Sequence, residues 1–227
     1  MARRRKVDNL LALAVLSMLT IRPAHPYSIA SALRATGKDR DMKIKWGSLY
    51  TVVGNLEKHG FVTATGTLRQ GRRPERTIYA ITDAGRAELK EWLCELVAVP
   101  YQEFPRFATA LSLIGSLHPT EVTALLSQRL RVLDAEIAGA RAALAEVAGT
   151  LPRVFLIEGE YGVALRQAEA EWIRSLLAEL EAGSFPGLDQ WRQAHETGVI
   201  PAELLALFNQ QTGGSWEGME REEHPTT

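Results

Sequence analysis

The side chains most often used in catalysis or metal binding form no recognisable group in this sequence. The five histidines are scattered, with no i,i+4 pair and no cysteine partner. They are His25, His59, His118, His195 and His224. The single cysteine, Cys94, lies in an amphipathic pattern that favours an inert thiol, and no serine lies in a nucleophile elbow. The sequence therefore predicts no enzyme, no metal site and no cofactor.

A different chemistry, the reading of nucleic acid, is indicated by residues 43–60. Their apolar positions have the spacing of one buried helix face, Leu49, Val52, Val53 and Leu56. The opposite face is small or hydrogen-bonding and carries no acid, as suits a helix in a DNA major groove. It consists of Tyr50, Thr51, Gly54, Asn55 and Lys58. We expect Ser48 to cap this helix through its hydroxyl and Gly60 to end it. An ordinary surface helix is the alternative for this stretch alone.

The distribution of charge supports the nucleic-acid reading better than the total does. The net charge is −1, yet residues 1–95 hold 17 Lys and Arg against 9 Asp and Glu, a balance of +8. The remaining residues have a balance of −9. A basic half joined to an acidic half indicates that only the first half faces a polyanion. One cysteine and no apolar run long enough to span a bilayer fit a cytoplasmic location without membrane attachment.

The elements around the candidate helix predict a helix-turn-helix core. Residues 1–8 are basic and are expected to form a flexible arm. Helices are predicted for residues 9–21, with Asn9 as cap, and for residues 27–36, ending at Gly37. A charged loop, residues 38–45, leads to the candidate helix, which is the third in order. Three short helices at this spacing form such a core.

The residues after Gly60 change from helical to strand periodicity. Residues 61–69 and 76–82 are rich in Thr, Val, Ile and aromatic residues, and the Gly and Pro between them favour a hairpin loop. Three helices followed by a hairpin with an arginine-rich tip are the layout of a winged helix. Arg72, Arg73 and Arg76 are then candidates for phosphate or minor-groove contacts, with solvated turn charge as the alternative. A further helix, capped at Thr82, closes a domain over residues 9–99.

The second half is predicted to be helical, after a link between Pro100 and Pro105. We expect a domain over residues 104–183, two appended short helices over residues 184–212 and a disordered tail over residues 213–227. A helix capped at Thr120 carries apolar residues at alternating spacings of four and three. This seam predicts coiled-coil packing and a dimer interface. Its residues are Leu126, Leu130, Leu133, Ile137, Ala140 and Leu144. A following helix, residues 154–181, could lie antiparallel to it through Tyr161, Leu165, Trp172 and neighbouring apolar positions.

Residues 47–62 resemble the recognition segment of PadR-type transcriptional regulators, G-[ST]-L-Y-x-x-[LV]-x-x-L-E-x-x-G-[LF]-[IV]. Residues 72–86 are similar to the family's wing, which ends in Y-x-[IL]-T-x-x-G-R, and residues 25–29 resemble the opening of its second helix. The resemblance covers about residues 8–95. It implies that Ser48, Tyr50 and Thr51 begin a recognition helix that contacts DNA and that Arg72 and Arg73 form the wing tip. It also implies a helical region used for dimerisation.

We therefore expect a mainly α protein with one small β-hairpin, an N-terminal winged helix and a C-terminal helical dimerisation domain. The expected function is a homodimeric repressor of a palindromic operator, released by a small-molecule effector. The expected DNA-binding residues are Lys43, Lys45, Ser48, Tyr50, Thr51, Asn55, Lys58, Arg72, Arg73 and Arg76. Trp92, Phe107 and Trp172 could bind an aromatic or drug-like effector, unless they are simply core aromatics. A protein-interaction module and an effector-independent architectural DNA-binding protein are the alternative functions.

Overall fold

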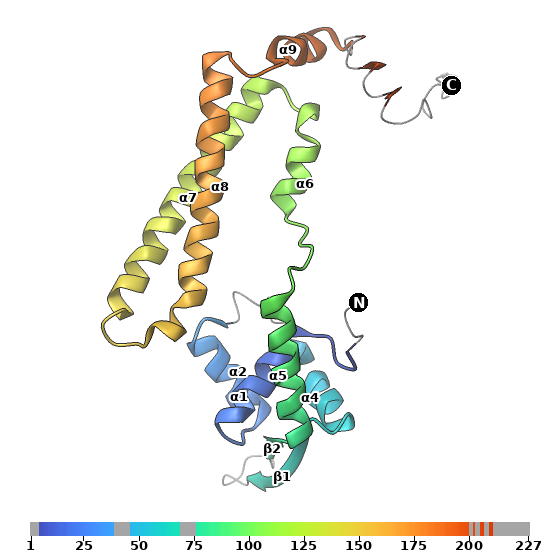
Figure 1. The fold of residues 1–227 in the computed structure, drawn as a ribbon, viewed down its shortest axis with the longest axis vertical. Coiled ribbons are helices and arrows are strands. Elements are labelled where there is room, and N and C mark those ends of the chain that lie inside the picture. Colours follow the sequence, from blue (N-terminus) through green and yellow to red (C-terminus); the bar gives the residue numbers. More distant parts are fainter. Residues whose placement is uncertain are drawn as a thin grey trace, which may run out of the picture. The chain divides into compact units, whose positions relative to one another are not determined.

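The computed structural model describes residues 5–38, 46–68 and 76–199, together with Ala202, Leu205, Ala206, Asn209 and Gln210. The chain divides into two compact units, Met1–Glu103 and Phe104–Thr227 (Figure 1). This division falls inside the link that the sequence places between Pro100 and Pro105.

The described residues of unit 1 form four α-helices, and three of these begin at a side-chain cap. They are α1 (Leu10–Ile21), α2 (Pro26–Ala35), α4 (Leu49–Lys58) and α5 (Asp83–Ala98). The side chains of Asn9, His25 and Thr82 accept backbone N–H groups of the first turns of α1, α2 and α5, respectively. A short 3₁₀ turn, η1 (Trp46–Ser48), runs directly into α4. Gly60 has φ +75° just after α4, as predicted for the residue that ends this helix.

A two-stranded antiparallel hairpin lies between α4 and α5. Strand β1 (Val62–Leu68) pairs with β2 (Arg76–Ile81), from Val62 opposite Ile81 to Leu68 opposite Arg76. The register shifts between Ala64 and Gly66, which marks a bulge. The connection between α1 and α2 adds one bridge to this sheet, because Ala24 and Tyr79 exchange both backbone hydrogen bonds at 3.0 Å.

The core of unit 1 is built around α1, which is buried on several sides. Leu11, Ala12, Val15, Leu16 and Leu19 are all under 5% exposed, and α1 contacts α2, α4, α5 and β2. The buried face of α4 is the predicted one, since all four of its apolar residues belong to this core. Burial of these side chains provides the main stabilisation of the unit.

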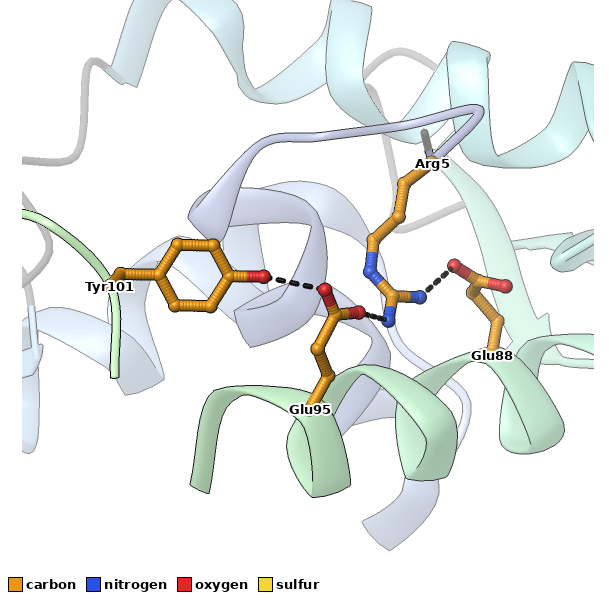
Figure 2. Close-up of polar contacts among 4 residues, drawn as sticks. All are labelled: Arg5, Glu88, Glu95 and Tyr101. Carbon is orange, nitrogen blue, oxygen red and sulfur yellow. Dashed lines mark hydrogen bonds and ion pairs between the residues drawn. The ribbon is translucent and has the colours of Figure 1, made fainter. Parts of the chain in front are cut away.

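The beginning of the described chain is anchored to α5, in contrast to the predicted flexible arm. The Arg5 side chain is 5% exposed and donates to Glu88 at 2.7 Å and also to Glu95. Figure 2 shows its guanidinium between these two carboxylates, with the Tyr101 hydroxyl donating to Glu95. Val7 is also buried. The expectation of a free basic arm therefore does not hold for residues 5–8, because an arginine and a valine both pack on the domain.

Unit 2 is helical throughout its described elements. They are α6 (Arg106–Ser112), η2 (Ile114–Ser116), α7 (Pro119–Val147), η3 (Arg153–Phe155), α8 (Ile157–Ala182) and α9 (Leu188–Thr197). Helix α6 ends at Ser112 and is followed by the 3₁₀ turn η2. Helix α7 is capped by His118 and begins at Pro119, so Thr120 is an early helical residue and not the predicted cap.

Helices α7 and α8 form an antiparallel hairpin with their apolar faces together (Figure 1). The predicted packing face of α8 holds only in part. Tyr161, Leu165 and Trp172 are 65%, 54% and 47% exposed, whereas Leu176 and Leu180 of the same predicted face pack in the core of unit 2. The other buried residues of α8 lie on a second apolar stripe, consisting of Val163, Ala170, Ile173 and Leu177. The two helices approach closely near the start of α8, where an added Cβ at Gly159 would lie 2.9 Å from Leu144.

Helix α9 packs on the other elements of unit 2. Leu188 is 3% exposed, and the indole N–H of Trp191 donates to the carbonyl of Leu117 at 2.9 Å. His195 Nε2 lies 2.9 Å from the carbonyl of Gly115. The helix therefore supplies partners to carbonyl groups where η2 turns into α7. No helix in the described part of the chain combines the length and the hydrophobicity needed to cross a membrane.

Candidate nucleic-acid interface

The exposed face of α4 brings together the predicted base-reading side chains. Tyr50 is 61% exposed, and Thr51, Asn55 and Lys58 are exposed as well. Space is open around Gly54, where an added Cβ would meet no atom within 4 Å. One feature differs from the prediction, because Glu57 is exposed on this helix and places a carboxylate near its C-terminal end. The hydrogen-bonding surface free of acid is thus the first part of α4.

Ser48 lies at the predicted position but does not act as the predicted cap. Its side chain makes no capping hydrogen bond, and its backbone is already helical, with φ −92° and ψ −5°. The reason is that η1 continues into α4, whereas a capping serine needs an extended backbone. Ser48 is half-buried.

Helix α4 and the hairpin are joined to α5 by backbone and hydroxyl contacts. The Thr82 hydroxyl donates to the carbonyl of Gly60 at 2.7 Å and accepts the N–H of Gly85 at 3.0 Å. The N–H of Thr82 donates to the carbonyl of Phe61 at 3.0 Å. Gly85 is required here, because a Cβ at this position would lie 2.0 Å from the Phe61 carbonyl oxygen. The end of α4 and the start of the hairpin are therefore both held against the first turn of α5.

Of the predicted basic contacts, Lys58 and Arg76 lie within the described residues. Arg76 begins β2, and its guanidinium lies 5.8 Å from the centre of the Tyr27 ring. Lys43, Lys45, Arg72 and Arg73 fall outside the described residues, so their role as phosphate contacts stays a prediction.

His25 lies beside these groups and was not predicted as a site residue. Its Nδ1 accepts the N–H of Tyr27 at 3.1 Å, and its ring lies edge-on to that of Tyr50, with centres 6.2 Å apart. Burial, and then the charge of Arg76, lower the pKa of this imidazole. The sequence signal was the pair His25-Pro26, since proline favours the first turn of a helix and the preceding residue is then its cap.

The three aromatic residues predicted for an effector are divided between the units. Trp92 is 4% exposed in the core of unit 1 and lies under the Arg5 guanidinium, so its ring offers no open face to a ligand. Phe107 and Trp172 lie together in unit 2, with ring centres 6.3 Å apart at 80°. The guanidinium of Arg129 lies 3.9 Å from the centre of the Phe107 ring.

The six seam residues of α7 pack within the chain itself. Leu126, Leu133 and Ile137 are buried at 4–7% exposure, and Leu130, Ala140 and Leu144 pack against the same cluster with residues of α8. The seam thus forms the core of the hairpin, and this face of α7 is not open to a second copy. The periodicity was read correctly, but it cannot distinguish a helix of the same chain from one of a partner.

Within the described residues, no three His, Cys, Asp or Glu side chains are grouped to hold a metal ion. His118 and His195 lie close together in unit 2, with ring centres 5.8 Å apart. His118 Nδ1 is occupied by the N–H of Thr120, and His195 Nε2 by the Gly115 carbonyl. The proximity of the two histidines is therefore explained by the packing of α9 on α7.

Residues 15–91 match the model of the transcriptional regulator PadR-like family. The negative transcriptional regulator PadR of Bacillus subtilis is 26% identical over 145 residues, which span 60% of this chain and 79% of the relative. Its crystal structure in complex with operator DNA has a TM-score of 0.64 at 22% identity, covering 76% of this chain and 99% of that one. The structure with p-coumaric acid gives 0.63 at 21% identity and the same coverage. This likeness confirms the predicted fold class.

Proposed function

Because residues 15–91 match the PadR-like family of transcriptional regulators, we propose that this chain is a homodimeric repressor that binds duplex DNA through α4 and the hairpin. The observation that carries this proposal is the exposed face of α4, where Tyr50, Thr51 and Asn55 are all exposed. Hydroxyl and amide groups on a protruding helix are the groups that read base edges in the major groove. Binding to the chromosome places the protein in the cytoplasm.

Phosphate contacts from basic residues around the hairpin would position α4. If Arg73 at the predicted tip makes one such contact, then Arg73→Ala flattens the plot of log affinity against log salt by about 0.9. Arg141→Ala, an exposed arginine of α7, serves as control and leaves the slope unchanged. A slope unchanged by both substitutions removes Arg73 from the DNA contacts.

The DNA proposal is tested by comparing a fragment of the protein's own promoter region with a random duplex of equal length. A regulator retains the promoter fragment at lower protein concentration than the random duplex. Equal retardation of both favours an architectural DNA-binding protein, and no retardation of either favours a protein-interaction module. Mapping of bound genomic fragments then identifies the operator, whose half-sites are expected about 10 bp, or a multiple of this, apart.

We propose that a second copy of the chain packs on an exposed stripe of α8 to form the dimer. This stripe consists of Ile157, Tyr161, Leu165 and Trp172, which are 47–65% exposed. These residues recur on one face of a long helix, and the seam of α7 is already filled by the chain itself. Sedimentation of the wild-type protein is expected to give a dimer, and Leu165→Glu is expected to give a folded monomer. A monomeric wild-type protein, or a dimeric Leu165→Glu variant, contradicts this assignment.

The effector is proposed to be a small aromatic acid bound in unit 2. A cavity of about 230 Å³ is lined by apolar side chains, including Phe107, Leu111 and Leu126, and by Arg129, whose Nε also donates to Glu169 at 2.6 Å. Such a site suits one ring and one carboxylate. Binding would favour a dimer geometry whose two α4 helices no longer match the groove spacing. Titration calorimetry with p-coumaric acid, the ligand in the B. subtilis PadR structure, is the first test, and Arg129→Ala should abolish any heat.

A further inference from the structure

A cavity of about 440 Å³ lies in unit 1 between the start of α2, the exposed side of α4 and β2. The polar side chains of its lining are His25, Tyr27, Tyr50, Arg76, Thr77 and Tyr79. They provide three phenols, an imidazole, a hydroxyl and a guanidinium, and no carboxylate belongs to the described lining. This composition is matched to an anion, because its neutral groups can donate hydrogen bonds and its single charge is positive.

The cavity is held by contacts between all three elements. The backbone pair between Ala24 and Tyr79 fixes the residue before His25 to β2. The Arg76 guanidinium lies over the Tyr27 ring, which ties β2 to α2, and the edge-on contact of His25 with Tyr50 ties α2 to α4. The lining groups are therefore positioned before any ligand arrives, which lowers the entropic cost of binding.

The hydrogen bond of His25 to α2 fixes which ring nitrogen carries the proton. Nδ1 accepts the Tyr27 N–H, so it is unprotonated, and the neutral imidazole carries its proton on Nε2. Nε2 lies on the side of the ring away from this bond. His25 thus presents a neutral N–H donor next to the Arg76 charge and the phenols.

We propose that this cavity is a clamp for one phosphate of the DNA backbone, formed by Arg76, the phenols of Tyr27 and Tyr50, and Nε2–H of His25. The proposal rests on the proposed function and refines it. Tyr50 becomes a backbone contact, and base reading falls to Thr51 and Asn55. We place the phosphate beside Tyr27 and Tyr50, which are 57% and 61% exposed, because Tyr79 is less exposed and lies near the negative charge of Glu57.

The chain provides its own control for His25. His118-Pro119 repeats His25-Pro26 at the start of α7, where His118 Nδ1 accepts the Thr120 N–H at 3.2 Å. Asparagine retains the ability to cap a helix but has no donor equivalent to Nε2. His25→Asn and His118→Asn therefore make the same local change, one beside the cavity and one in unit 2. Tyr27→Phe is a second variant that removes only a phenolic hydroxyl.

The experiment measures binding to a promoter fragment and to a random duplex of equal length, at several salt concentrations, with a melting curve for every variant. Arg76→Ala is expected to flatten the salt dependence by about 0.9 on both duplexes. His25→Asn and Tyr27→Phe are expected to weaken binding to both duplexes by about fivefold, the effect of one neutral hydrogen bond, with the salt slope unchanged. His118→Asn is expected to bind like the wild-type protein.

A phosphate contact must act on both duplexes because the backbone carries no sequence information. Losses confined to the promoter fragment would assign the cavity to base reading and overturn the clamp. Wild-type affinity in both Tyr27→Phe and His25→Asn also overturns it, while leaving the proposed function intact. A wild-type protein that binds neither duplex overturns the proposed function together with the clamp.

Discussion

The guanidinium of Arg5 lies 5.2 Å from the centre of the Trp92 ring, while its nitrogens bond to Glu88 and Glu95 of the same helix. Arg5→Ala leaves two largely buried carboxylates without their cation and uncovers the Trp92 ring. We expect the melting temperature of the protein to fall by several degrees in circular dichroism. Arg86→Ala removes an exposed arginine of α5 and is expected to change it little, so an equal fall for both variants contradicts this role of Arg5.

Substitution of Gly54 is expected to change the stability of the protein and its DNA affinity in opposite directions. Gly54→Ala has room for its methyl group and should raise the free energy of unfolding by about 1 kcal/mol through helix propensity. The same methyl group protrudes beside the phosphate cavity and should weaken DNA binding. Gly139→Ala in α7 also has open space and should stabilise the protein without changing its affinity for DNA. Urea unfolding and duplex titration provide the two readouts, and unchanged DNA affinity in Gly54→Ala excludes close approach of the backbone.

The pH dependence of unit 1 should reflect Glu95 and Tyr101. The hydrogen bond from Tyr101, and then that from Arg5, hold the pKa of Glu95 below its usual 4.5. A carboxyl group with a lowered pKa in the folded state stabilises above about pH 4.5 and loses this contribution as the pH falls through the folded pKa. The hydrogen bond to Glu95 raises the pKa of Tyr101 above 10.0, so its contribution is lost as the pH rises beyond 10. Tyr101→Phe should raise the pKa of Glu95 in a carbon-13 NMR titration; an unchanged value argues against the bond.

The stability of the α7–α8 helical hairpin should depend on the buried stripe of α8 and not on the exposed one. Ile173 is 0% exposed, so Ile173→Ala should lower the free energy of unfolding by about 3 kcal/mol. Leu165 is 54% exposed, and Leu165→Ala should cost the folded monomer little. Chemical unfolding at a protein concentration low enough to suppress dimers makes the comparison. The reverse order of the two losses contradicts the packing of α7 against α8.

Much of unit 1 was predictable because its signals are local. Proline, glycine and capping residues mark the ends of α1, α2 and α5, and the change of period after Gly60 marks the hairpin. The Ser48 cap was the exception, since a 3₁₀ turn before α4 depends on residues that have no simple periodicity. The burial of Arg5 was also out of reach, because its partners lie 83 and 90 residues away.

Unit 2 shows where periodicity alone is ambiguous. Helix α8 carries two apolar stripes, and the sequence analysis placed Tyr161, Leu165 and Trp172 on the packed face. Close packing selected the stripe with Gly159 and Ala170, since the antiparallel partner approaches closely there. The α7 seam was read as an interface between chains for a similar reason. A pattern identifies a face that must be covered but not what covers it.

The single hydroxyl of Thr82 contacts the chain where α4 ends, beside the end of the hairpin and at the first turn of α5. A displacement transmitted along α5 therefore carries the helix and the wing as one body, without bending either against the other. For the proposed dimer, we therefore expect an effector to change the spacing between the two DNA-binding domains and not the contacts within either one.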